Sequence, residues 1–142
     1  MQRNKKLAFE WVLKDEHLSS LPGLTAVWNV LCCDDLVDGL DYFMLDTAVA
    51  CSSVNAARWL ELLAHNPIVN VTYEGAVEHA NALGAETVIS GLELYRRRRL
   101  KVDPEWQRYG VEWSNRCTRA KKRALKMVEQ AELSALALSA TA

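Results

Sequence analysis

The chain has 142 residues, half of them hydrophobic and a quarter charged, which is the composition of a folded globular protein and excludes a disordered chain. A formal net charge of -1 excludes a general electrostatic attraction to nucleic acid or to an anionic membrane. No apolar run approaches the roughly 18 residues of a membrane-spanning helix. The length predicts one domain with a single sizeable core.

The first helix is expected to begin after Asn4, which can cap it, and to end near Glu16. The opening MQRNKK is similar to the basic start of a signal peptide, but Glu10 interrupts the apolar run that follows, and a secretory segment needs about 7–15 apolar residues. We therefore expect no signal peptide.

The most regular pattern lies between Asp38 and Leu63. After Gly39, apolar residues recur at steps of three and four, which predicts a helix with one apolar side and with Asp41 and Asp46 away from it. Ser52 and Ser53 interrupt this pattern as loop or N-cap residues, and a second apolar stripe follows. Two helices with so short a connection are expected to pack as a hairpin.

Four further helical segments are expected after residue 70. Thr72 can cap a helix over residues 73–83 that Gly84 closes, and a longer helix follows over residues 85–101. Asp103–Pro104 predicts the start of a short helix through Trp106, and a last helix is expected over residues 110–133. The small residues of 134–142 predict a frayed tail. The fold class is therefore all-α, a single compact domain of about six helices.

The four cysteines do not have the spacing of a metal site. Cys32 and Cys33 are adjacent, which is poor geometry for a mutual disulfide, while Cys51 and Cys117 lie on apolar helix stripes. We expect four reduced, structural thiols, no metal and no cofactor.

The hairpin resembles the phage-type muramidases of glycoside hydrolase family 108. That family has a leucine, an aromatic residue, an aspartate and Ala-Val in this order, then a turn and a helix of the Ala-Ala-Lys-Trp-Leu kind. The stretch Ala56-Ala57-Arg58-Trp59-Leu60 is similar to that helix. Further on, Tyr109-Gly110, Trp113 and Asn115-Arg116 resemble the family's closing Phe-Gly-Lys-Gly-Trp-Leu-Asn-Arg motif. The resemblance is weak over residues 5–20 and good over most of 27–130.

The resemblance implies a lysozyme-like fold and an action on bacterial peptidoglycan. It places Glu16 at the position of the family's catalytic acid, where it would protonate the leaving oxygen of the glycan strand. It divides the domain into a remnant of the lysozyme N-terminal part (1–35), a hairpin with a peptidoglycan-binding helical part (36–133) and the tail (134–142). The partner is then a glycan strand, and delivery to the wall is by holin from a host cytoplasm or on a virion.

Two departures from the family pattern keep a second hypothesis open. The glycine-rich loop region that follows the catalytic glutamate in the family is almost entirely absent from the stretch His17 to Thr25, and Ala50-Cys51-Ser52 replaces the usual Asn-Ser-Gly. The lost loop would build much of a substrate cleft. The alternative is therefore a catalytically degenerate member that serves as a virion structural or host-interaction protein.

The remaining site residues follow from residue type and position. Trp28 and Trp106 lie near loops and are candidates for stacking on sugars at a surface or cleft, while Trp11, Trp59 and Trp113 are expected in the core. Asp46 is a candidate substrate-binding carboxylate. The run Arg96, Arg97, Arg98 and Arg99 is a candidate contact for an acidic partner or another virion or host protein. Nucleic acid is a poor fit, because no aromatic residues for base stacking interrupt the run.

Overall fold

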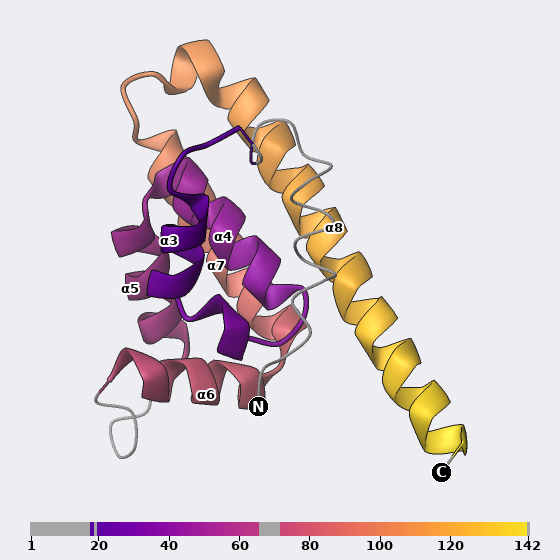
Figure 1. The fold of residues 1–142 in the computed structure, drawn as a ribbon. Coiled ribbons are helices and arrows are strands. Elements are labelled where there is room, and N and C mark those ends of the chain that lie inside the picture. Colours follow the sequence, from indigo (N-terminus) through magenta and orange to yellow (C-terminus); the bar gives the residue numbers. More distant parts are fainter. Residues whose placement is uncertain (1–17, 19, 66–71, 142) are drawn as a thin grey trace.

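The computed structural model describes residues 18, 20–65 and 72–141, and within these ranges all regular structure is helical. The helices are α3 (Leu24–Val30), η1 (Cys33–Asp35, a 3-10 turn), α4 (Leu40–Cys51), α5 (Ser53–Leu63), α6 (Tyr73–Leu83), α7 (Ala85–Lys101) and α8 (Trp106–Thr141). The six α-helices of the described ranges form one bundle and confirm the predicted all-α fold class (Figure 1). The helix expected before Glu16, with Trp11, lies outside the described residues. In the part of the chain that the structure describes, no helix is long and apolar enough to cross a membrane.

Helix α4 is the centre of the bundle, packed against α5, α7, α8 and η1. Its residues from Leu40 to Ala48 are all buried, so the predicted one-sided apolar stripe is wrong for this helix. Asp41 and Asp46, expected off the stripe, are buried as well. The Oδ1 atom of Asp41 accepts hydrogen bonds from the backbone N–H groups of Gly39 and Tyr42 at 3.0 and 2.7 Å, which satisfies this carboxylate at the helix start.

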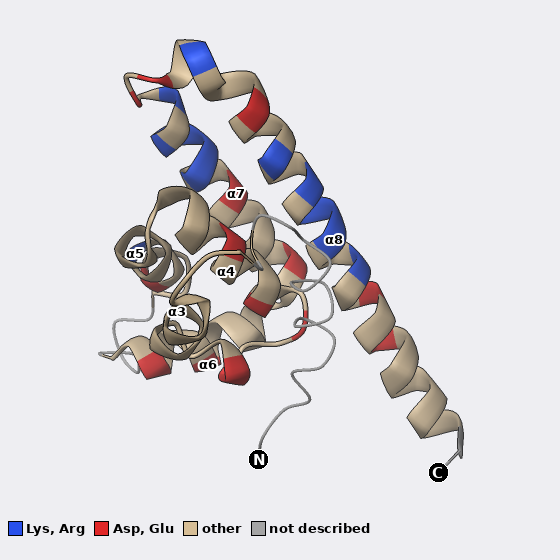
Figure 2. Cartoon of the chain, turned by 45° about the horizontal axis from the view of Figure 1, so that its top comes forward, with Lys and Arg blue, Asp and Glu red and all other residues tan. Residues whose placement is uncertain are grey.

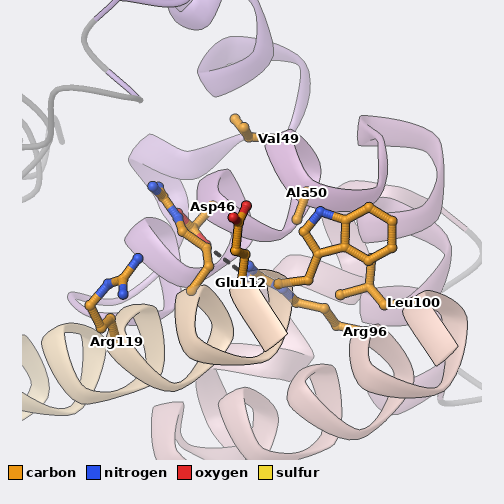
Figure 3. Close-up of a pocket in the computed structure, with 9 residues that line it drawn as sticks. Asp46, Val49, Ala50, Arg96, Leu100, Glu112 and Arg119 are labelled. Carbon is orange, nitrogen blue, oxygen red and sulfur yellow. Dashed lines mark hydrogen bonds and ion pairs between the residues drawn. The ribbon is translucent and has the colours of Figure 1, made fainter. Parts of the chain in front are cut away.

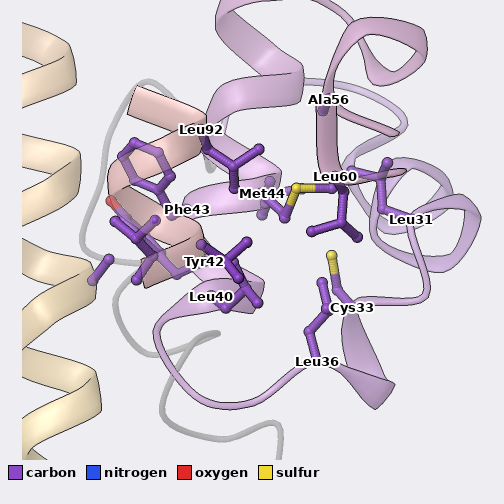
Figure 4. Packing of buried hydrophobic residues seen from close by; sticks show 14 of the residues in the cluster. Leu31, Cys33, Leu36, Leu40, Tyr42, Phe43, Met44, Ala56, Leu60 and Leu92 are labelled. Carbon is purple, nitrogen blue, oxygen red and sulfur yellow. The ribbon is translucent and has the colours of Figure 1, made fainter. Parts of the chain in front are cut away.

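The core is formed where α4, α5 and α7 meet (Figure 4). Phe43 and Met44 from α4, Leu60 from α5 and Leu92 from α7 are fully buried there, each contributing about 1.5–3 kcal/mol of burial free energy. The indole ring of Trp59 stacks on Tyr95 with ring centres 6.0 Å apart, which confirms that Trp59 is a core residue.

Local sequence signals predict the helix ends correctly at three positions. The Ser52 hydroxyl accepts from the N–H of Asn55, and the Thr72 hydroxyl accepts from the N–H of Gly75, so both residues cap helices as predicted. Gly84 ends α6 with φ 101°, a conformation that favours glycine. The four cysteines are free thiols, as expected.

Helix α8 differs from the prediction at both ends. Asp103 accepts a hydrogen bond from the N–H of Glu105 at 2.9 Å, but it opens no separate short helix, since α8 itself begins at Trp106. The residues expected to fray continue α8 to Thr141, and Figure 1 shows this end extending beyond the bundle. Alanine and leucine dominate this end, and their strong helix propensity is consistent with the extension.

Candidate functional site

A pocket of about 360 Å³ lies where the first half of α8 crosses α4 and α7 (Figure 3). Helix α4 contributes Asp46, Val49 and Ala50 to its lining, α7 contributes Arg96 and Leu100, and α8 contributes Glu112, Trp113, Arg116 and Arg119. The pocket therefore joins the hairpin to the Trp113 region, which are the two most specific parts of the sequence resemblance.

Asp46 is the anchor of this pocket. Its side chain is 1% exposed, and its Oδ2 lies 2.8 Å from Nη1 of Arg96, whose side chain is 0% exposed. Its Oδ1 accepts a hydrogen bond from Nε of Arg116 at 3.1 Å. Because a buried carboxylate needs compensating charge, these contacts fix the two arginines at the pocket wall.

The guanidinium of Arg96 is only partly satisfied. Its Nη1 lies 3.4 Å from the Thr47 hydroxyl, and its contact with Asp46 is an ion pair without the alignment of a hydrogen bond. The Phe43 ring, with its centroid 5.6 Å from Cζ, offers a cation–π contact. The buried Nε and Nη2 have no hydrogen-bond partner. An unsatisfied buried donor costs about 1–3 kcal/mol, and more when it is charged.

An aromatic cluster lies at the start of α8, next to this pocket. The Trp106 and Trp113 ring centres are 6.4 Å apart, and those of Tyr109 and Trp113 are 5.8 Å apart. All three residues are half-buried, so part of each ring surface stays open. A Cβ atom at Gly110 would lie 2.7 Å from the Trp106 indole, so glycine allows this ring to lie flat against the helix.

A second hollow, of about 460 Å³, adjoins Trp106 and is lined further by Gln107, Gly110, Val111, Ser114 and Asn115. Trp106 belongs to this hollow and Trp113 to the first pocket. The two hollows share no lining residue, and the helical period places their α8 residues on different sides of α8, so each of the two tryptophans borders a hollow of its own.

Basic side chains line α8 beyond the pocket, visible as a blue band along the middle of the helix (Figure 2). Arg119, Lys122, Arg123 and Lys126 surround a third hollow of about 330 Å³. These four residues recur at steps of three, one and three, so they share one face of the helix. Arg119 also lines the first pocket, so the basic face continues directly from it.

The structure places the predicted site residues in different environments. Glu16 lies outside the described residues, so its catalytic role stays a prediction. Trp28 is 1% exposed, and its indole N–H donates to Oδ1 of Asp34 at 2.7 Å, so its expected place at a surface is wrong. Asp46 lines the pocket but is held by arginines. Trp106 is half-buried at a hollow, as a surface candidate should be.

The arginine run does not form one contact surface. Arg96 is buried behind the first pocket, which corrects its expected place on a surface that a partner protein could contact. Arg97 bridges α7 and α8, donating to the hydroxyls of Ser114 and Thr118 at 2.9 and 3.0 Å. Arg98 and Arg99 are exposed, and Arg99 lies 3.7 Å from Asp103. Consecutive residues of an α-helix point in different directions, because each is rotated by about 100° from the one before. The four arginines therefore have different neighbours.

Four aromatic or charged lining residues were not predicted as site residues. Trp113 was expected in the core, whereas Glu112, Arg116 and Arg119 were given no role of their own. Their one signal in the sequence was the closing motif around Trp113 and Arg116. Among the described residues, no group of three His, Cys, Asp or Glu side chains is placed to hold a metal ion.

No protein-family model and no curated protein sequence matches this chain. The structure is similar to that of Brucella abortus SagA, with a TM-score of 0.63 over 85% of this chain and 74% of that chain. The sequences are 23% identical over this match. The likeness shows a shared all-α fold.

Proposed function

We propose that this protein is a lysozyme-like protein that binds bacterial peptidoglycan at the aromatic start of α8. The observation that carries the proposal is the first pocket, whose α4 and α8 walls come from the two stretches that resemble the family 108 muramidases. Asp46 belongs to one stretch and Arg116 to the other, and the hydrogen bond between them joins the two. The fold shared with Brucella abortus SagA over most of both chains is consistent with the proposal.

The chemistry of the aromatic cluster suits a glycan strand. Sugar rings present apolar C–H faces that pack on indole rings, while their hydroxyl and acetamido groups bond to polar neighbours. Trp106 and Trp113 offer partly open rings, and Ser114 and Asn115 supply polar groups in the adjoining hollow. Each ring would offer its open face to a sugar at the hollow that it borders.

Hydrolysis is a separate hypothesis that depends on Glu16. A glycosidase of the usual kind also needs a second carboxyl group. Asp46 is a poor candidate for that role, since Arg96 and Arg116 engage its oxygens. Glu112 is the exposed carboxylate of the pocket and is the better candidate. Turbidity loss of a peptidoglycan suspension with the wild type, but not with Glu16→Gln, would support catalysis.

The binding proposal is tested by sedimentation of the protein with purified, insoluble peptidoglycan. The wild type should pellet, and Trp106→Ala should weaken binding about 5- to 30-fold, as loss of an aromatic contact worth about 1–2 kcal/mol predicts. Val54→Ala, an exposed apolar truncation on α5, is the matched control and should bind like the wild type. Circular dichroism establishes that each variant is folded.

Two results would contradict the proposal. Absence of wild-type protein from the pellet would remove peptidoglycan as a ligand and favour the alternative of a virion or host-interaction protein. Equal sedimentation of Trp106→Ala, Trp113→Ala and the wild type would show that the aromatic cluster is not the binding surface.

A further inference from the structure

We infer that the pocket between α4, α7 and α8 binds a carboxylate group, received by the unpaired edge of Arg96 and by Arg119. The assignment of this carboxylate to peptidoglycan rests on the proposed function, whereas the anion site itself rests on the geometry of the pocket.

The unpaired atoms of Arg96 form a matched pair. In a guanidinium group, the Nε–H and one N–H of Nη2 point in the same direction and form the side-on fork that accepts a planar carboxylate. Asp46 contacts Nη1 and therefore does not engage this fork. Both fork atoms are buried and lack a hydrogen-bond partner, and Arg96 lines the pocket. The fork atoms have almost no accessible surface in this structure, so an oxyanion in the pocket supplies the two missing acceptors only if the side chains around the fork shift as it enters.

The charges of the pocket point to the same class of ligand. Three arginines and two carboxylates line it, which leaves one positive charge in excess. A monoanion would balance the pocket, whereas a cation would add to the excess. Arg119 is exposed and lines the pocket from α8, where Figure 3 shows it on the same helix as Glu112.

The volume of the pocket and its apolar wall fit a small acid that is attached to an apolar or sugar group. A volume of about 360 Å³ lies in the range of small-molecule sites, and Trp113, Val49 and Leu100 form its apolar wall. Peptidoglycan carries carboxylates of two kinds beside its sugars. One is the lactyl group of N-acetylmuramic acid, and the other is the free acid of the stem peptides. Both offer the same carboxylate chemistry, so the experiment has to separate them.

The test is an NMR titration of the full chain with three probes. N-acetylmuramic acid presents the lactyl carboxylate, acetyl-D-alanyl-D-alanine presents a peptide carboxylate, and N-acetylglucosamine is the neutral control. We expect one of the two acids to bind at least about tenfold more tightly than the neutral sugar, because hydrogen bonds to charged groups are the stronger ones. The acid that binds identifies the source of the carboxylate.

Surface variants keep the test independent of folding. Arg119→Gln should weaken binding of the acid about threefold, and Glu112→Gln should tighten it by a similar factor, because it removes a competing negative charge at the rim. Arg58→Gln removes an exposed arginine from α5 and should change nothing. Acids that bind no better than the neutral sugar would overturn the inference. An Arg119→Gln or Glu112→Gln variant that binds the acid like the wild type would also overturn it.

The outcome separates the anion site from the proposed function. If the protein sediments with whole peptidoglycan while neither acid binds, the carboxylate site is wrong and the proposed function stands. If an acid binds with the expected dependence on Arg119 and Glu112 while the protein does not sediment, the anion site stands and peptidoglycan is the wrong ligand.

Discussion

Arg116 on α8 donates a hydrogen bond from Nε to Oδ1 of Asp46 on α4, over 3.1 Å and across 70 residues of sequence. This contact brings the closing motif of the chain against its central helix. With Arg96, which lies 2.8 Å from the other oxygen of Asp46, it forms a charged centre of two arginines and one carboxylate. The centre both holds α7 and α8 on α4 and builds the wall of the candidate pocket.

The two partners in this centre should differ in their contribution to stability. Asp46→Asn leaves two arginines without their carboxylate, and we expect a loss of about 3–5 kcal/mol in the free energy of unfolding. Arg96→Met removes the unpaired Nε–H and Nη2–H groups while Arg116 still compensates Asp46, so its loss should be clearly smaller. Urea unfolding measures both. Equal losses, or a larger loss for Arg96→Met, would contradict this account.

The close approach of α4 to α8 depends on Gly39. Its φ is +91°, and a Cβ atom there would lie 2.5 Å from the carbonyl oxygen of Ala124 and 2.6 Å from Cγ2 of Val128. We therefore expect Gly39→Ala to cost about 3 kcal/mol or more, from backbone strain and a steric overlap together.

Gly23 provides the control for this substitution. It also has a positive φ, +75°, but no atom lies within 4 Å of the position that a Cβ atom would take there. Gly23→Ala should cost about 1 kcal/mol, from the backbone alone. Similar losses for the two variants in urea unfolding would show that the contact between α4 and α8 is looser than described.

The sequence was informative where local chemistry decides structure. The caps at Ser52 and Thr72 and the end at Gly84 depend on neighbouring residues only, and these were predicted correctly. The burial of Asp46 depends on arginines 50 and 70 residues away, which periodicity cannot reveal. Trp28 was misplaced for the same reason, since a position near loops does not show what packs over a ring. The pocket at Trp113 was visible only through the family resemblance.

The contact between α7 and α8 should stabilise the protein less as the pH falls, because Glu93 takes part in it. Burial alone raises the pKa of Glu93, but the hydrogen bonds and charges of Lys121 and Arg97 outweigh it and bring this pKa below its ordinary value of 4.5. A carboxyl group with a lowered pKa stabilises the folded state above its ordinary pKa, and this contribution is lost as the pH falls through the folded pKa.

Glu93→Gln should therefore destabilise the protein at pH 7, by about 1 kcal/mol for a partly exposed pair. The difference from the wild type should shrink below pH 4.5 as the wild-type carboxyl group takes up its proton. Thermal unfolding of both proteins across this range measures the effect. A difference that is the same at pH 7 and at pH 3 would exclude the ion pairs as its cause.

The basic face of α8 should make peptidoglycan binding sensitive to salt. Lys122 and Lys126 are exposed on this face, and their attraction to the acidic groups of the wall is screened as ionic strength rises. We expect Lys122→Gln/Lys126→Gln to bind peptidoglycan more weakly than the wild type at low salt. Added salt should weaken the binding of this variant less than it weakens that of the wild type. The control Arg58→Gln/Arg98→Gln removes the same charge from exposed positions on α5 and α7. If the two double variants change the salt dependence of binding equally, net charge alone causes the effect and the basic face of α8 has no special role.

The central claim, that the aromatic start of α8 receives a glycan strand, is tested most directly by the indole N–H signals of the tryptophans. In an NMR titration with soluble peptidoglycan fragments, the signals of Trp106 and Trp113 should shift with the same saturation curve. Those of Trp28 and Trp59, which are buried, should stay in place and serve as internal controls. Saturable shifts that spare Trp106 and Trp113, or no shifts at concentrations that saturate sedimentation, would contradict the claim.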